Sequence, residues 1–89
     1  MSFETSALKG LAISENGLVF DPMTGSIFTS NPVGMRIIEL LRKGNEVTKV
    51  EDAIIDEFDI DRETAVHDAY EFTTQLLGLG LIKDKGKKK

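Results

Sequence analysis

The sequence predicts an α+β domain in which a three-stranded antiparallel sheet near residues 10–30 is followed by three helices. Two observations carry this prediction. The first third of the chain contains two hairpin signals, Asn16-Gly17 and the turn-forming run from Asp21 to Gly25. The remainder has apolar residues at helical spacing, divided by residues that typically start or end helices. Runs of strands followed by runs of helices are typical of α+β domains.

Length and composition exclude several classes of site. A chain of 89 residues can bury one modest hydrophobic core. It has no cysteine and one histidine, which excludes disulfides, thiolate metal sites, cysteine nucleophiles and any site that needs two imidazoles. The net charge of −4 disfavours a nucleic-acid partner, because that binding depends on neutralising phosphates. The N-terminus has no long apolar run of the kind that forms a signal peptide or a membrane span. A cytoplasmic location is therefore the default expectation.

The three strands are expected near residues 11–13, 18–20 and 27–29, where β-branched and aromatic residues gather. A two-residue loop at Asn16-Gly17 would place Ile13 opposite Phe20, and a four-residue loop at 22–25 would place Phe20 opposite Ile27 and Val19 opposite Phe28. A slip of one residue in the second loop would exchange the faces of the last strand. The more apolar face is expected to meet the helices, and it consists of Leu11, Ile13, Leu18, Phe20 and Ile27. The other face carries Ala12, Ser14, Val19 and Phe28.

Each helix has a recognisable start. The expected helices span 32–43, 49–58 and 62–77, and their start signals are Asn31 followed by Pro32, the capping box Thr48-Lys49-Val50-Glu51, and Asp61. Gly44 and Gly78 are expected to end the first and third helices. Residues 1–9 are expected to be a flexible N-terminus, 10–82 the folded domain, and the lysine-rich segment 83–89 a disordered tail.

The third helix has more apolar surface than a small domain normally needs. One stripe, sufficient for the core, consists of Ala65, Ala69, Phe72 and Leu76. A second stripe, about 100° away around the helix, consists of Val66, Tyr70, Thr73 and Leu77. This second stripe either packs on the sheet or another helix, or lines a groove that is open to a partner.

Catalysis is poorly supported. The carboxylates Asp56, Glu57, Asp59, Asp61 and Asp68 stand at a helix end and a helix cap, where acidic residues normally occur. The spacing of Asp59, Asp61 and Glu63 lacks the glycine of a calcium loop, and Gly78-Leu79-Gly80 follows a helix instead of opening one, unlike a phosphate loop. His67 lies off the core stripe and is expected to be solvated. We therefore expect no catalytic residues, no metal and no cofactor.

The order of three short strands, a capped helix and two more helices is that of a winged-helix-like domain. One function of such domains is DNA binding, in which the third helix would enter the major groove. That helix carries Glu63, Asp68 and Glu71 against the single cation Arg62, so it would repel phosphate. Another alternative is an interaction subunit, which would bind a folded protein partner and would not bind a peptide.

The spacing of several motifs resembles the PqqD family, named for a protein of pyrroloquinoline quinone biosynthesis. The resemblance covers about residues 11–82. Its motifs are Asp21-Pro22-x-Thr24-Gly25, Phe28, Asn31-x-x-Gly34-x-x-Ile37-x-x-Leu40-Leu41, Phe58-Asp59-Ile60-Asp61 and Leu76-Leu77-x-x-Gly80-Leu81-Ile82. Ser30 departs from the pattern, because an apolar residue commonly precedes the asparagine.

The resemblance implies a peptide chaperone, or recognition element, for ribosomally made peptides that are later modified. A leader peptide would add as an extra strand beside the third strand and lie against the third helix. The module would deliver it to a modifying enzyme, often a radical S-adenosylmethionine protein. No nucleic-acid or membrane partner is expected, and the chain is expected to be monomeric. The expected peptide-binding residues are Ser26, Ile27, Phe28, Thr29, Ser30, Val66, Tyr70, Thr73 and Leu77.

Overall fold

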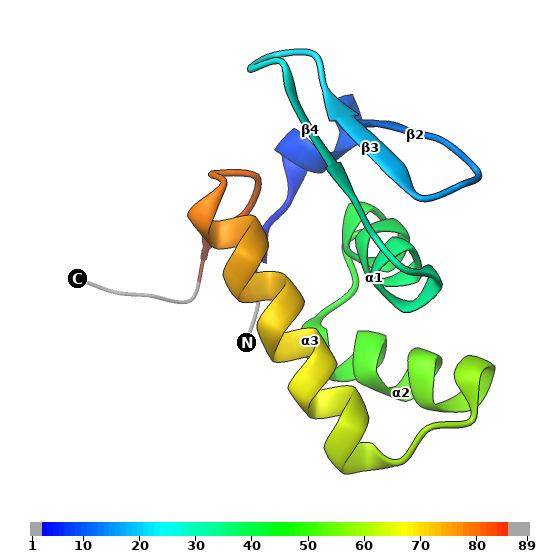
Figure 1. Ribbon diagram of the computed structural model, residues 1–89. Helices are drawn as coiled ribbons and strands as arrows, with labels where there is room; N and C mark the ends of the chain where they lie inside the picture. Colours follow the sequence, from blue (N-terminus) through cyan, green and yellow to red (C-terminus); the bar gives the residue numbers. More distant parts are fainter. Residues whose placement is uncertain (1–2, 86–89) are drawn as a thin grey trace.

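A computed structural model describes residues 3–85 and confirms the α+β prediction, with a three-stranded sheet followed by three helices (Figure 1). The sheet consists of β2 (Ala12–Ile13), β3 (Leu18–Asp21) and β4 (Ser26–Thr29). The helices are α1 (Pro32–Arg42), α2 (Val47–Phe58) and α3 (Arg62–Gly78). In Figure 1 the sheet stands over α1, α2 lies below that helix, and α3 runs diagonally to the left of both.

Two of the three predicted helix starts are confirmed. The Asn31 side chain accepts a hydrogen bond from the Gly34 N–H at 2.8 Å, and Asp61 does the same for Thr64 at 2.8 Å. The predicted capping box is wrong, because α2 begins at Val47 and no side chain caps it. Val47 packs against the hydrophobic core, and this contact favours a start earlier than the local signal indicates.

One of the two predicted hairpin registers is correct. In the second hairpin Val19 lies opposite Phe28, and Phe20 opposite Ile27, as expected. The first register was wrong, because Phe20 lies opposite Ala12 and not Ile13. The Ser14 N–H donates to the Leu18 carbonyl at 2.9 Å, so the loop has three residues and ends at Gly17 with a φ of +87°. This is the loop in which a left-handed glycine forms a bulge.

The shifted register corrects the predicted sheet face. Ile13 now lies opposite Val19 instead of Phe20, so the face that meets the helices carries Ile13, Val19 and Phe28. Val19 is fully buried, whereas Ile27 on the opposite face is 62% exposed. The side chains of Leu18 and Phe20, which were expected inside, are exposed as well.

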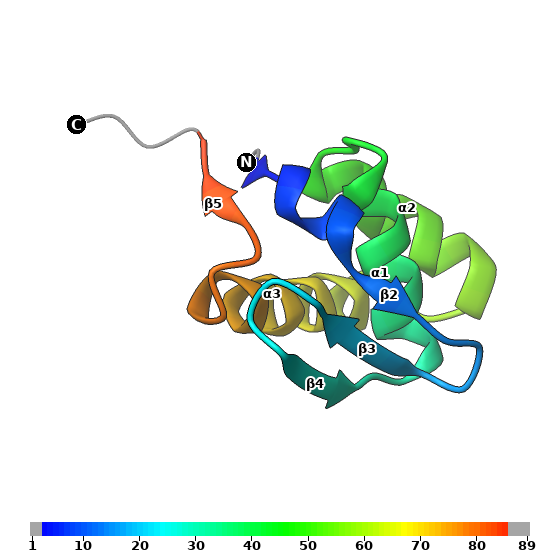
Figure 2. The same cartoon turned by 90° about the horizontal axis from the view of Figure 1, so that it is seen from above.

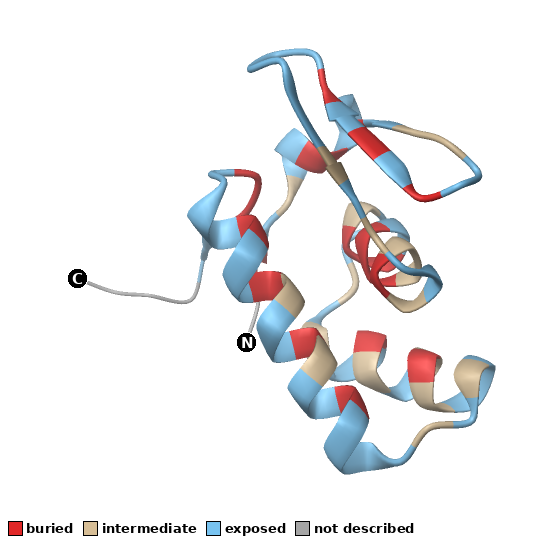
Figure 3. Ribbon diagram, viewed as in Figure 1, coloured by how far each residue is buried: buried red, intermediate tan, exposed pale blue. Residues whose placement is uncertain are grey.

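The core lies between the sheet and the helices and includes residues from both ends of the chain (Figure 3). Phe3 and Leu8 are buried in it, and so are Leu81 and Ile82. The short strands β1 (Phe3–Glu4) and β5 (Lys83–Asp84) pair with each other, and a 3-10 helix, η1, spans Ser6–Gly10. Regular structure thus extends into 3–9 and 83–84, where none was expected, and the end of the predicted tail (86–89) lies outside the described residues.

Within residues 3–85 no helix has the length and apolar character needed to cross a membrane.

Candidate peptide-binding site

The strand β4 forms a free margin of the sheet. The strand order is β2-β3-β4, and Figure 2 shows β4 at one margin and β2 at the other. The Ser30 N–H donates to the Gly17 carbonyl at 2.8 Å, which makes this pair a hydrogen-bonded pair of the ladder. Hydrogen-bonded and non-bonded pairs alternate in an antiparallel ladder. Phe28 and Ser26 therefore turn their backbone groups toward β3, and Ile27 and Thr29 turn theirs outward.

This margin has none of the features that usually prevent a strand from pairing with another chain. Its sequence, Ser26-Ile27-Phe28-Thr29, contains no charged residue and no proline, and each of its residues pairs in order with β3. Edge strands are usually protected by lysine, proline, a bulge or a covering element. No strand pairs with the outer side of β4 in the part of the chain that the structure describes. Two residues thus present unpaired backbone donors and acceptors to a possible partner.

Gly34, in the first turn of α1, lies between the end of β4 and helix α3. A Cβ atom on Gly34 would collide with Ser30 Oγ and would lie 2.9 Å from Cε1 of Phe72. The backbone of α1 therefore approaches both neighbours closely, which a side chain would prevent. Ser30, which departs from the family pattern, is small enough for this contact. The contact places the Phe72 side of α3 beside the end of the free strand.

A small hollow opens at this junction. It has a volume of about 120 Å³ and is lined by the start of α1 and by one flank of α3: Asn31, Val33, Gly34, Ile37, Asp68, Glu71, Phe72 and Gln75. Ile37 is buried and Phe72 and Asp68 are half-buried. The hollow thus has an apolar floor and a rim of amides and carboxylates.

The two flanks of α3 differ in position. At 100° per residue, Phe72 lies about 55° to one side of the centre of the buried stripe, with Asp68 and Gln75 about 100° away on that same side. Val66, Tyr70 and Leu77 lie about 85° to the other side on average. The second group is partly exposed, with Tyr70 at 69%, and none of its members lines the hollow beside β4. We call the first group the inner flank and the second the outer flank.

The structure thus brings only some of the sequence-predicted site residues together. Residues 26–30 form the free strand and its end, whereas Val66, Tyr70 and Leu77 lie on the outer flank. Thr73 is buried, and its hydroxyl donates to the carbonyls of Ala69 and Tyr70 at 2.8 and 3.1 Å. The role of the outer flank in peptide binding stays a prediction.

Sequence reasoning missed the inner flank as a candidate wall. Phe72 was assigned to the core stripe alone, and Asp68 and Gln75 fell on a polar part of the helical wheel. The missing information is the contact between Gly34 and Phe72, which joins residues 38 positions apart. The one available signal was Gly34 itself, because a glycine inside a helix often marks a close approach of another segment.

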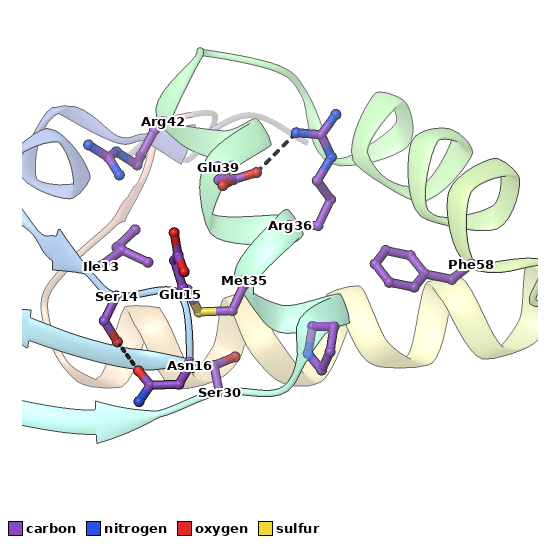
Figure 4. Close-up of a pocket in the computed structure, with 12 residues that line it drawn as sticks. Ile13, Ser14, Glu15, Asn16, Ser30, Met35, Arg36, Glu39, Arg42 and Phe58 are labelled. Carbon is purple, nitrogen blue, oxygen red and sulfur yellow. Dashed lines mark hydrogen bonds and ion pairs between the residues drawn. The ribbon is translucent and has the colours of Figure 1, made fainter.

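A second hollow, of about 670 Å³, lies between α1 and the loop that joins β2 to β3, and Ser30 at the end of β4 also lines it (Figure 4). Ile13, Met35 and Phe58 line it together with charged side chains of α1. Among these, Arg36 bonds to Glu57 at 2.8 Å and to Glu39 at 3.0 Å, and these hydrogen bonds raise the pKa of the guanidinium. Residues 3–85 contain no group of three metal-ligating side chains placed to hold an ion.

Comparisons with known proteins agree with this geometry. A family model described as coenzyme PQQ synthesis protein D (PqqD) matches residues 17–82. One similar solved structure is TbiB1 in complex with the TbiA(beta) leader peptide, with 29% identity, a TM-score of 0.72, and 89% of this chain and 91% of that chain covered. Another is a lasso peptide synthetase B1 complexed with the leader peptide, with 21% identity, a TM-score of 0.70, and 83% and 88% covered. No curated protein sequence matches the chain.

Proposed function

The chain belongs to the PqqD family, and we propose that it is a binding module that captures the leader of a ribosomally made precursor peptide as an added strand on β4. It then presents the rest of the precursor to a modifying enzyme. The observation that carries the proposal is the unprotected margin of β4, where Ile27 and Thr29 turn their backbone groups outward. Strand addition uses main-chain hydrogen bonds for affinity and side-chain pockets for specificity.

The comparisons support the same ligand class. TbiB1, which shares 29% of its residues with this chain and is covered over 91% of its length, was solved with a leader peptide bound. The contact residues we propose are the backbone of Ser26–Thr29, the end of the strand at Ser30, and the inner flank of α3. An added strand would direct alternate side chains toward that flank.

The proposed role needs neither catalysis nor a cofactor, so we propose that the modifying enzyme supplies the chemistry. Some carboxylates of the chain serve in a helix cap, such as Asp61, or in an ion pair, such as Arg62–Asp52 at 2.8 Å. Because the ligand is made by ribosomes, we propose that the module acts in the cytoplasm. Exposed Glu63 and Glu71 on α3 oppose the alternative of DNA binding.

The first experiment compares proline at the two margins of the sheet. A display library of random 12-residue peptides is selected on the immobilised protein, and one recovered peptide is titrated calorimetrically against variants. Thr29→Pro removes an outward N–H of β4, and Ile13→Pro removes an outward N–H of β2, so neither breaks a ladder bond. We expect Thr29→Pro to lower peptide affinity more than about tenfold, as for the loss of a hydrogen bond or more, and Ile13→Pro to keep it.

Phe28→Pro serves as the internal check on the register. The Phe28 N–H faces β3, so its removal breaks the sheet, and thermal melts should show a loss of about 3 kcal/mol or more. Thr29→Pro should melt much closer to the parent protein. Full peptide affinity in a folded Thr29→Pro variant would mean that no strand is added to β4, and the proposed function would then be wrong.

A further inference from the structure

We propose that this module selects cationic leader peptides, and that the hollow between α1 and α3 receives a lysine or arginine side chain of the peptide against Asp68. The inference rests on the proposed strand addition at β4 and names the class of peptide that this site takes. It uses three observations: the register of β4, the position of the hollow at the end of this strand, and the charge of the residues that line it.

The register determines which peptide side chain reaches the hollow. Phe28 faces the helices, and side chains alternate along a strand, so Ser30 continues on the same face. Directly paired residues in a sheet share a face. The peptide residues opposite Phe28 and Ser30 would therefore both point toward the helices. The one opposite Ser30 lies nearest the hollow, because Ser30 touches Gly34 and Asn31 follows it directly.

The lining of the hollow suits a long cation. Two carboxylates, from Asp68 and Glu71, stand on its rim, and no lysine or arginine lines it. Phe72 and Ile37 offer apolar surface to an aliphatic stem, as lysine and arginine stems require. A volume of about 120 Å³ leaves room for one side chain of this kind.

Asp68 is the carboxylate that remains available. Glu71 Oε2 lies 3.3 Å from His67 Nε2, and the Asn31 side-chain oxygen accepts from the Gly34 N–H. Asp68 is half-buried and makes no hydrogen bond or ion pair with any residue between 3 and 85. A peptide carboxylate placed here would be repelled, and a short apolar side chain would leave Asp68 without a partner.

Asp68 has one alternative role, which the experiment must separate. It lies beside the N-terminal end of α1, whose helix dipole favours a negative charge. If that is its whole role, Asp68→Asn will lower thermal stability and leave the choice of peptide unchanged.

The test repeats the selection from the random 12-residue library on four proteins: the parent chain, Asp68→Asn, Asp68→Lys and the control Glu63→Gln. Glu63 is another carboxylate of α3, but it is exposed and lies outside the hollow. In peptides selected by the parent and by Glu63→Gln, we expect lysine and arginine to be enriched at one position, two residues from an apolar position. Asp68→Asn should lose this enrichment, and Asp68→Lys should replace it with aspartate and glutamate.

One recovered peptide is then used to measure how much its cation contributes to binding. Replacing its enriched cation by methionine should weaken binding about two- to fivefold, the range for a partly exposed ion pair, and should have no further effect on Asp68→Asn. Binding peptides without any preference for a cation would overturn this inference while leaving strand addition intact. Recovery of no peptide by any of the folded proteins would overturn the proposed function itself, and this inference with it.

Discussion

The two margins of the sheet differ in how far they are protected against pairing. β4 has four residues in unbroken register with β3, and none is charged. β2 has two residues and runs into a three-residue loop that carries Glu15 and ends in the bulge at Gly17. Short strands, bulges and nearby charges are the usual protections of a sheet edge. The sheet thus closes one margin and leaves the other available to a peptide.

The hollows near the two margins differ in the charges that line them. Beside β2, Arg36 and Arg42 stand among Glu15 and Glu39 (Figure 4). Arg36 is already paired with Glu39 and Glu57. Opposite charges that bind each other offer little net attraction to a ligand. The hollow beside the end of β4 is smaller and carries negative charge only. Charge selection of a peptide is therefore expected at the β4 margin and not at the β2 margin.

Among substitutions outside the strands, the largest effect is expected at Gly17, which shapes both margins. Its φ of +87° forms the bulge that shortens β2, and its carbonyl accepts the Ser30 N–H that holds the end of β4. A Cβ atom here would collide with the Ser30 carbonyl oxygen. Gly17→Ala should therefore cost about 2–4 kcal/mol in the free energy of unfolding, from the left-handed backbone and the collision together. Chemical denaturation of the parent and variant proteins measures this loss in the free energy of unfolding.

Gly25→Ala is the matched control. Gly25 has a φ of +80°, but no atom would lie within 4 Å of an added Cβ. Only the backbone cost of about 1–2 kcal/mol remains. Equal losses for the two variants would show that the contact between Gly17 and Ser30 does not stabilise the end of β4.

The second prediction compares the flanks of α3. Phe72→Leu keeps most of the core volume and should cost less than about 1.5 kcal/mol in stability. It should still weaken binding of a selected peptide by about 1 kcal/mol, because it removes an aromatic wall of the hollow. Tyr70→Ala should leave affinity within about twofold, since Tyr70 lies on the outer flank. Titration calorimetry of both variants with the selected peptide measures which substitution lowers the affinity.

A loss of more than about 1 kcal/mol for folded Tyr70→Ala would instead support the sequence-based interpretation, in which Tyr70 is an aromatic hot spot. The outer flank would then belong to the peptide site, and the inner flank would serve mainly to pack α3 against α1.

The sequence predicted what local chemistry determines. Asn31 and Asp61 cap their helices, and the turn from Pro22 to Gly25 sets the register of β4, because each of these signals acts within a few residues. The failures arose where one signal allows two outcomes. Asn16-Gly17 fits both a two-residue loop and a three-residue loop with a bulge, and that choice of one residue reversed the sheet face.

The structure shows the predicted strand of the candidate site, and it adds a second candidate flank on the helix. A free third strand follows from chain order, so residues 26–30 were named correctly as its extent and end. Which flank of α3 faces that strand depends on how two helices cross, and only the contact between Gly34 and Phe72 reveals it. The apolar character of Val66 and Tyr70 was a real feature, but hydrophobicity alone does not say toward which neighbour a flank points.

A small effect, comparable with that at Tyr70, is expected at Ile27. Its side chain is 62% exposed on the sheet face that points away from the helices, whereas its N–H and carbonyl face the free margin. If the peptide is held mainly by main-chain hydrogen bonds, Ile27→Ala keeps those groups and should change the affinity of a selected peptide less than about threefold. Calorimetry measures the affinity, and melting curves should stay close to the parent because little apolar surface is lost from the core. A tenfold loss with an unchanged melting curve would show that Ile27 itself fills a pocket in the ligand, and that the exposed sheet face takes part in binding.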